Sequence, residues 1–319
     1  MNTTTVRTRF VLILALLVFA TFAATSSTLA CVVGTGTSAS CTEAALDACL
    51  PGGGSFDGTV TFACGGAATI TVTSAKTISA DTTIDGGSVI TISGSGNAVG
   101  VLSVNSGVTF TVENLTVANG HTRGAITNGG TLTVTNCTFS GNSAGSGGAI
   151  SNGGTLTVTN STFSGNSATL GGAISNEGTL TVTNSILANS TSGGNCGVPA
   201  GITAIFTDGG HNIDDGTTCG FTGTNCASTT GTSFCNTNPL LDPAGLASNG
   251  GPTQTITLEA GSPAINAGDE TVCAAPPVNN LDQRGFVRPG AGATNCSVGA
   301  YEFNAARCGA SAGGSCWSP

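Results

Sequence analysis

Acidic side chains and histidines are the residues of this sequence whose types could support acid–base chemistry or metal binding. The chain has 16 Asp and Glu and only two His. Asp208, His211, Asp214 and Asp215 lie close together in sequence and could supply ligands for a calcium ion or a sugar. Asp is also a common turn residue that accepts hydrogen bonds from nearby backbone amides. We therefore expect no cofactor, with Ca²⁺ at Asp208, Asp214 and Asp215 as the alternative.

Carboxylates are scarce in the middle of the chain. Between Gly86 and Thr207 the only acidic residues are Glu113 and Glu177, which are too far apart in sequence to suggest a pair. Polysaccharide lyases and hydrolases need clustered carboxylates for acid–base work. This region therefore predicts no catalysis, and an enzyme site is expected only outside it. The run from Asp282 to Arg284 could be catalytic by residue type, but a buried Arg–carboxylate clamp is the simpler interpretation.

The N-terminus predicts export. Arg7 and Arg9 precede an apolar run over residues 10–22, and residues 28–30 form an acceptable cleavage site, so residues 1–30 are interpreted as a signal peptide. Cleavage would leave five basic and 16 acidic residues, a net charge of −11. Such a surface is a poor partner for nucleic acid. No second long apolar run follows, so we expect no transmembrane segment in the mature chain.

Thirteen cysteines are consistent with export, because disulfides persist outside the cytoplasm. Cys31 follows the cleavage site and could be either lipidated or disulfide-bonded. Cys64 is expected to pair with a cysteine of the N-terminal segment. Cys137 has Ser161 and Ser185 at the equivalent positions of a repeat, so we expect it to be free.

The repeat is the element that must position all these side chains. The segment Gly-Thr-Leu-Thr-Val-Thr-Asn occurs at residues 130–136, 154–160 and 178–184, with a period of 24. Leu and Val alternate with Thr, so they share one face of a strand and Thr the other. One unit has room for three short strands and three turns, and its apolar face requires stacked neighbours. The sequence thus predicts an all-β, right-handed, single-stranded parallel β-helix, a pectin-lyase-like solenoid of about 24 residues per coil with disulfide-rich caps.

Stacking predicts which side chains meet inside. The expected apolar columns are Phe110 with Leu132, Leu156 and Leu180; Val112 with Val134, Val158 and Val182; Ile126 with Ile150 and Ile174; and Phe139 with Phe163 and Ile186. The last column assumes a one-residue deletion before Ile186. Two asparagine ladders are also expected, since amides stack at a spacing of about 4.8 Å. They are Asn128, Asn152 and Asn176, and Asn136, Asn160 and Asn184.

The outward threonines form a candidate binding surface. If Leu132 and Val134 point inward, the flanking threonines point outward and stack into a three-by-three grid. The grid consists of Thr131, Thr133, Thr135, Thr155, Thr157, Thr159, Thr179, Thr181 and Thr183. This flat array resembles those of β-helical ice-binding proteins. Thr is also a favourable uncharged residue for any solvated strand face.

Two family resemblances follow from these motifs. The Gly-Gly-Ala-Ile segments at 147–150 and 171–174, with Phe-x-x-Asn, resemble the repeats of polymorphic outer-membrane proteins, which are surface proteins linked to adhesion. The C-terminal part resembles the bacterial choice-of-anchor Q domain family, on six sequence blocks. They are residues 238–241 (Asn-Pro-Leu-Leu), 249–255, 261–269, 282–285 (Asp-Gln-Arg-Gly), 288–289 and 298–302. This resemblance implies a secreted or surface-associated bacterial protein.

These observations predict five parts of the chain and a function. The parts are a signal peptide (1–30), an N-terminal cap (31–58), a β-helix (59–204), a choice-of-anchor Q-like region (205–303) and a cysteine-containing tail (304–319). We expect an interaction protein, secreted or on the surface of a bacterium, whose partners are glycans or other surface molecules. The alternatives are a carbohydrate-active enzyme with its site in the irregular coils, and ice binding by the threonine face.

Overall fold

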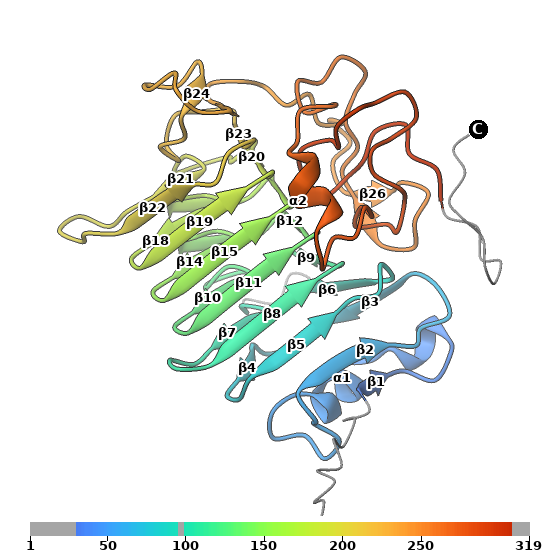
Figure 1. Cartoon of the computed structure of the whole chain (residues 1–319). Coiled ribbons are helices and arrows are strands. Elements are labelled where there is room, and N and C mark those ends of the chain that lie inside the picture. The colour runs from blue at the N-terminus through green and yellow to red at the C-terminus, as the bar shows by residue number, and fades with distance from the viewer. Residues whose placement is uncertain (1–29, 95–98, 308–319) are drawn as a thin grey trace, which may run out of the picture.

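The computed structural model describes residues 30–94 and 99–307. Residues 1–29 of the predicted signal peptide and the tail cysteines Cys308 and Cys316 lie outside these residues. The chain winds into a three-sided parallel β-solenoid of about seven turns, with a C-terminal region packed along one flank (Figure 1). The predicted all-β solenoid with about 24 residues per coil is confirmed, and its handedness stays a prediction.

Three parallel sheets form the walls of the solenoid. Sheet A consists of β1 (Cys31–Val33), β2 (Thr59–Phe62), β5 (Thr82–Asp85), β8 (Thr109–Glu113), β11 (Thr131–Thr135), β15 (Thr155–Thr159), β19 (Thr179–Thr183) and β22 (Ile205–Asp208). Sheet B consists of β3 (Ala68–Thr71), β6 (Ile90–Ser93), β9 (Thr116–Ala118), β12 (Thr138–Ser140), β16 (Thr162–Ser164), β20 (Ile186–Ala188), β23 (Ile213–Asp214), β25 (Ser233–Phe234) and β24 (Gly223–Thr224). Sheet C consists of β4 (Lys76–Ile78), β7 (Leu102–Val104), β10 (Ile126–Asn128), β14 (Ile150–Asn152), β18 (Ile174–Asn176) and β21 (Cys196–Gly197).

A few shorter elements complete the fold. They are the 3-10 helix η1 (Ser38–Ser40), helices α1 (Glu43–Cys49) and α2 (Glu270–Ala274), the parallel pair β13 (Ser143–Ser146) and β17 (Ser167–Leu170), and the antiparallel pair β26 (Ala247–Ser248) and β27 (Gln254–Thr255). Within the described part of the chain, neither α-helix has the length and apolar character needed to cross a membrane.

The interior columns follow from the alternation of apolar and hydroxyl residues. Leu132 pairs with Phe110 and Leu156, and Val134 with Val112 and Val158, all fully buried. Ile126 and Ile150 stack in the same way in sheet C. Because adjacent coils have the same sequence, each side chain stacks on the equivalent side chain of the next coil, and this fixes the register between neighbouring strands. Three of the predicted columns are thereby confirmed.

The fourth column differs by one residue from the prediction. Phe163 stacks on Phe139 with ring centroids 4.7 Å apart, but its next neighbour is Leu187, not Ile186. The spacing of 24 is kept without a deletion, because Asn189 adopts a positive φ of 56°, as Gly165 does one coil earlier with a φ of 68°. Ile186 therefore points outward and is buried under the C-terminal region.

One asparagine column forms a ladder in the interior turns. Asn128 Nδ2 donates to Asn152 Oδ1, and Asn152 Nδ2 to Asn176 Oδ1, both at 2.7 Å. The three side chains are at most 1% exposed. A shorter ladder that the sequence reasoning missed joins Asn142 Nδ2 to Asn166 Oδ1 at 3.0 Å. These amides satisfy turn groups inside the solenoid, where water cannot reach them.

The other predicted ladder is wrong. Asn136, Asn160 and Asn184 adopt positive φ angles of 51°, 46° and 51°. No hydrogen bond joins their amides to one another, although Asn136 Nδ2 donates to Asn114 Oδ1 one coil earlier at 3.3 Å, and all three amides contact the C-terminal region. Asn136 donates to the carbonyl of Leu281 at 3.1 Å, and Asn184 to that of Asp269 at the same distance. These turns therefore form part of the contact with the C-terminal region.

The N-terminal end of the solenoid is closed by α1. The Thr42 side chain accepts a hydrogen bond from Ala45 N and so caps the helix. Lys76 is 8% exposed and forms ion pairs with Glu43 at 2.6 Å and Asp47 at 2.9 Å, which hold α1 against the first coils.

Disulfides reinforce both ends of the solenoid and the C-terminal region. Five pairs join the described cysteines: Cys31–Cys49, Cys41–Cys64, Cys196–Cys219, Cys226–Cys235 and Cys273–Cys296. Cys31 is thus disulfide-bonded, and Cys64 has the expected kind of partner. Cys137 is free, as expected, and burial raises the pKa of its thiol to about 12. Its Sγ donates a hydrogen bond to Thr135 O at 3.2 Å. One coil later, the Ser161 hydroxyl makes the equivalent hydrogen bond to Thr159 O.

The C-terminal region covers most of sheet B and lies beside the C-terminal ends of the sheet A strands (Figure 1). Outward-facing Ile186, Ala188 and Ile213 of the solenoid join a second apolar core with residues such as Leu258 and Val298. The predicted clamp is present, since Arg284 Nε and Nη2 bind Asp282 Oδ2 at 2.9 and 2.6 Å. It holds the loops of this region together at the solenoid surface.

Candidate functional site

The outward face of sheet A carries a longer threonine column than the predicted grid, which covered only three coils. Strand registers align one threonine from each of seven consecutive strands, running from β2 to β22. The column consists of Thr59, Thr83, Thr111, Thr133, Thr157, Thr181 and Thr207. A second column beside it consists of Thr109, Thr131, Thr155 and Thr179. All these side chains are at least partly exposed.

The third column of the expected grid is not free along its whole length. Thr135 is only 3% exposed, whereas Thr159 and Thr183 are partly exposed. The next residue of the same turn, Asn136, donates to Leu281 O, so the loop around Leu281 lies over this end of sheet A. The accessible surface is therefore two columns wide at Thr135, not three.

Two carboxylates lie side by side on the same face of sheet A, a pair that the sequence did not predict. Glu113 had been compared with Glu177, but the register places it directly beside Asp85 of the preceding coil. Burial, and then the charge of Asp85, raise the pKa of Glu113. Asp85 Oδ1 accepts hydrogen bonds from Gly87 N and Asn114 Nδ2. The 28-residue offset between the two acids hides this pairing, because it departs from the 24-residue period.

The aspartates that were candidates for calcium are engaged in turns. Asp208 accepts hydrogen bonds from Thr222 N at 2.8 Å and Ser233 Oγ at 2.8 Å. Burial works against its charge, but these donors prevail and lower the pKa of Asp208. Asp214 accepts from Gly216 N and Cys219 N. In residues 30–94 and 99–307, no group of three or more His, Cys, Asp or Glu side chains has an arrangement that could hold a metal ion.

Asp215 and His211 also have local partners. Asp215 Oδ2 accepts from Asn189 N at 2.7 Å, and His211 Nδ1 lies 2.7 Å from the carbonyl oxygen of Ala267. The four side chains near positions 208–215 thus fix the end of the solenoid and its contact with the C-terminal region. Calcium binding there stays a prediction.

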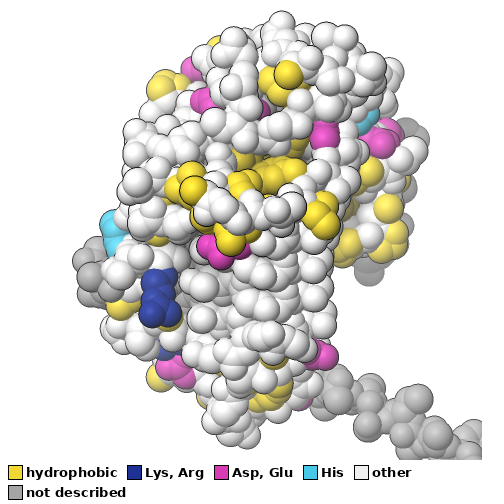
Figure 2. Space-filling model, turned by 90° about the vertical axis from the view of Figure 1, so that its left-hand side faces the viewer, with side chains coloured by type: hydrophobic (Ala, Val, Ile, Leu, Met, Phe, Trp, Pro, Cys, Tyr) yellow, Lys and Arg dark blue, Asp and Glu magenta, His cyan; other side chains and the backbone are white. Residues whose placement is uncertain are grey.

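One side of the solenoid, where the chain passes from sheet C to sheet A, carries few charged side chains (Figure 2). The main group of hydrophobic side chains lies in the upper middle of this view, and others are scattered over the rest of it. Val198 and Ile202, which lie between β21 and β22, and Ile205, the first residue of β22, are 39%, 43% and 58% exposed.

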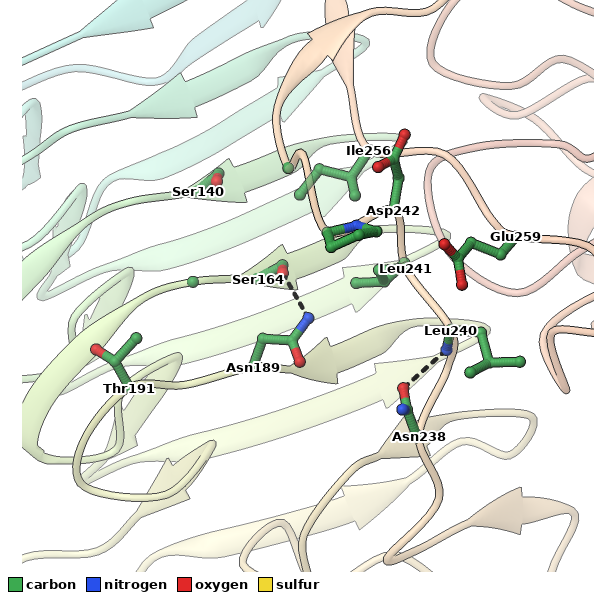
Figure 3. A pocket seen from close by; sticks show the side chains of 13 residues that line it. Ser140, Ser164, Asn189, Thr191, Asn238, Leu240, Leu241, Asp242, Ile256 and Glu259 are labelled. Carbon is green, nitrogen blue, oxygen red and sulfur yellow. Dashed lines mark hydrogen bonds between the residues drawn. The ribbon is translucent and has the colours of Figure 1, made fainter.

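A groove of about 550 Å³ lies between sheet B and the C-terminal region (Figure 3). Its lining is Ser140, Ser164, Gly165, Asn189, Thr191, Asn238, Leu240, Leu241, Asp242, Pro243, Gly245, Ile256 and Glu259. Side chains at the ends of β12 and β16 and after β20 form the solenoid wall, and the segment around Leu241 forms the other. Ligand sites commonly have volumes of about 300–1,000 Å³.

The polar groups of this groove are only partly used within the protein. Asn189 Nδ2 donates to Ser164 Oγ at 3.3 Å, and Asn238 Oδ1 accepts from Leu240 N at 2.9 Å. Asp242 accepts from Ala244 N and Thr257 Oγ1, so it also shapes a turn. The sequence reasoning missed this groove, although the block at residues 238–241 had been noted as a motif. On the solenoid wall, Ser140 and Ser164 lie inside the Phe-x-x-Asn repeat motif, which had been noted only as a family resemblance and not as part of a site.

Comparison with known families gave one match. The model of the Chlamydia polymorphic membrane protein repeat matches residues 136–153 and 160–177, two segments one coil apart. This similarity and the solenoid fold indicate a surface, adhesin-like protein, and the disulfides are of an extracellular type. Neither the curated proteins nor the solved structures gave a match.

Proposed function

We propose that this chain is an interaction protein displayed outside a bacterial cell, and that it binds an extended, uncharged glycan along the threonine face of sheet A. The observation that carries this proposal is the seven-strand threonine column, which is uncharged and in continuous register. A regular row of hydroxyls at about 4.8 Å presents donors and acceptors to a polymer lying along the solenoid axis.

Several observations support display outside the cell. The chain resembles polymorphic membrane protein repeats, its described residues form five disulfides, and its C-terminal blocks resemble the choice-of-anchor Q family. Disulfides persist mainly in oxidising compartments. The N-terminal sequence supports export by a signal peptide.

The test is a glycan array probed with the wild-type chain and with the double variant Thr133→Tyr/Thr157→Tyr. Bulky rings on two adjacent coils would keep a polymer off the face, so binding should weaken about tenfold or more, which corresponds to about 1.4 kcal/mol. Thr127→Tyr in β10 is the matched control, because Thr127 is outward-facing on sheet C. Equal binding by all three proteins would contradict this use of the face.

The same proteins address the two competing functions. The strict register of the threonine columns favours ice binding as a second candidate, which inhibition of ice recrystallisation by the wild type but not the double variant would support. A panel of lyase and hydrolase substrates tests the enzyme alternative.

We propose the binding function first, because both carboxylate pairs are partly used by the fold. In the groove, Asp242 and Glu259 come from loops and Asp242 shapes a turn. On sheet A, the Asp85 carboxylate beside Glu113 accepts hydrogen bonds from Gly87 N and Asn114 Nδ2.

A further inference from the structure

We propose that the groove between sheet B and the C-terminal region is a second glycan site, and that it takes a sugar carrying a protonated amine, such as a hexosamine unit. This inference extends the proposed function, since its ligand is also a glycan, but it concerns a different surface and a different ligand charge. The residues involved lie on both walls of the groove in Figure 3.

The shape of the groove suits one or two sugar rings. Leu241 and Ile256 are 7% and 2% exposed and give the groove an apolar floor. Sugar rings have apolar C–H faces that pack against such side chains, with hydroxyls at their edges. A concave site with an apolar base and a few convergent polar groups is the usual composition of a small-ligand site.

The solenoid wall offers hydrogen-bonding groups that its own fold leaves unused. Ser164 is 6% exposed, and its oxygen accepts from Asn189, so its proton remains available to a ligand. Ser140 Oγ and Thr191 Oγ1 form no hydrogen bond with any residue that the structure describes. Because Ser140 and Ser164 are in register on adjacent strands, these hydroxyls are spaced by about 4.8 Å. Such a row fits successive ring hydroxyls.

The opposite wall sets the charge of the ligand. Asp242 and Glu259 both line the groove from the C-terminal region, and the lining contains no Lys, Arg or His. Glu259 is exposed, and its carboxylate has no hydrogen-bond partner among the described residues. An anionic sugar, such as a uronate, would be repelled. A protonated amine would gain two attractive charges without displacing an existing ion pair.

The test is a titration of the full chain with a glucosamine oligomer and with its N-acetylated counterpart, in weakly acidic buffer that keeps the amines protonated. We expect the glucosamine oligomer to bind at least fivefold more tightly. Raising the salt from about 50 mM to about 500 mM should remove most of that preference, because exposed charges are screened. Glu259→Gln should weaken glucosamine binding about threefold to fivefold and leave N-acetylglucosamine binding unchanged.

Matched variants and a second polymer complete the experiment. Glu177→Gln, which changes an exposed acid on a turn of the solenoid far from the lining residues, should leave both affinities unchanged. Equal binding of the two oligomers, or equal loss in both Glu variants, would overturn the proposal. A lysine oligomer that binds with the same dependence on Glu259 would show a cationic-peptide site instead, and would also overturn it.

The outcomes separate this site from the threonine face. Selective glucosamine binding that depends on Glu259 but survives Thr133→Tyr/Thr157→Tyr supports the groove, even if the glycan array is blank. If array binding is lost in the threonine variant and the chain shows no preference for glucosamine, the result supports glycan binding by the threonine face and contradicts an amino-sugar site in the groove.

Discussion

Asp282→Ala should destabilise the C-terminal region by about 3–5 kcal/mol, the range expected when one partner of a buried ion pair is removed. Asp282 is 1% exposed and accepts five hydrogen bonds within its own region. Their donors are the backbone N–H groups of Arg284, Phe286 and Glu302 and the Arg284 Nε and Nη2 atoms. Alanine would leave the Arg284 charge buried without a counter-charge.

The loss should extend to the contact with the solenoid. The neighbouring Gln283 is fully buried, accepts from Thr138 Oγ1, and donates to Thr116 Oγ1 at 2.8 Å. Both threonines belong to sheet B, so Gln283 joins the C-terminal region to two coils. Without the clamp, the loop that positions Gln283 would lose its fixed conformation.

Thermal unfolding and limited proteolysis measure this effect. We expect the melting temperature to fall by roughly 10 °C, with cleavage after Cys235 appearing before cleavage in the solenoid. The exposed Asp81, whose carboxylate accepts one backbone hydrogen bond from Thr109, gives the control Asp81→Ala. If Asp282→Ala costs no more than this control, the clamp has no structural role. Adding Arg284→Met to Asp282→Ala should recover part of the loss, because it removes the stranded charge.

Asn152→Ala is expected to destabilise the solenoid by about 3 kcal/mol. Asn152 is the middle residue of the ladder, and it accepts from Asn128 and donates to Asn176. It also donates to the carbonyls of Gly154 and Thr179 at 3.2 and 3.1 Å. Alanine would leave several buried polar groups without partners, and each such group costs about 1–3 kcal/mol.

Denaturant unfolding of the regular coils tests this prediction. Thr155→Ala, three residues away on the exposed face of β15, should change the unfolding free energy by less than about 0.5 kcal/mol. An Asn152→Ala variant as stable as Thr155→Ala would show that water replaces the missing amide. In that case the ladder would contribute little to stability.

The sequence was sufficient where one coil repeats the next. Leu156 had to stack on Leu132, and Asn152 on Asn128, because an exact repeat offers each side chain its own copy as the nearest neighbour. The free state of Cys137 followed in the same way from Ser161 one coil later. The predicted register was wrong at Ile186, because a sequence alignment cannot show that Asn189 adopts a positive φ as Gly165 does one coil earlier.

The sequence was insufficient where parts distant in the chain meet. Asn136, Asn160 and Asn184 have the same spacing as the ladder residues, but their turns point toward the C-terminal region, and only its position decides their partners. Asp85 and Glu113 became neighbours through a coil whose length departs from the repeat. The groove exists only because the segment around Leu241 packs beside Ser140 and Ser164.

The sequence by itself therefore determined the solenoid, its period, its interior and its outward threonines, since these depend on contacts between equivalent residues of adjacent coils. The tertiary structure alone decided how much of the threonine face stays open and where a groove forms. Both depend on how the C-terminal region docks against sheets A and B, through contacts such as Gln283 with Thr138 that no periodicity encodes.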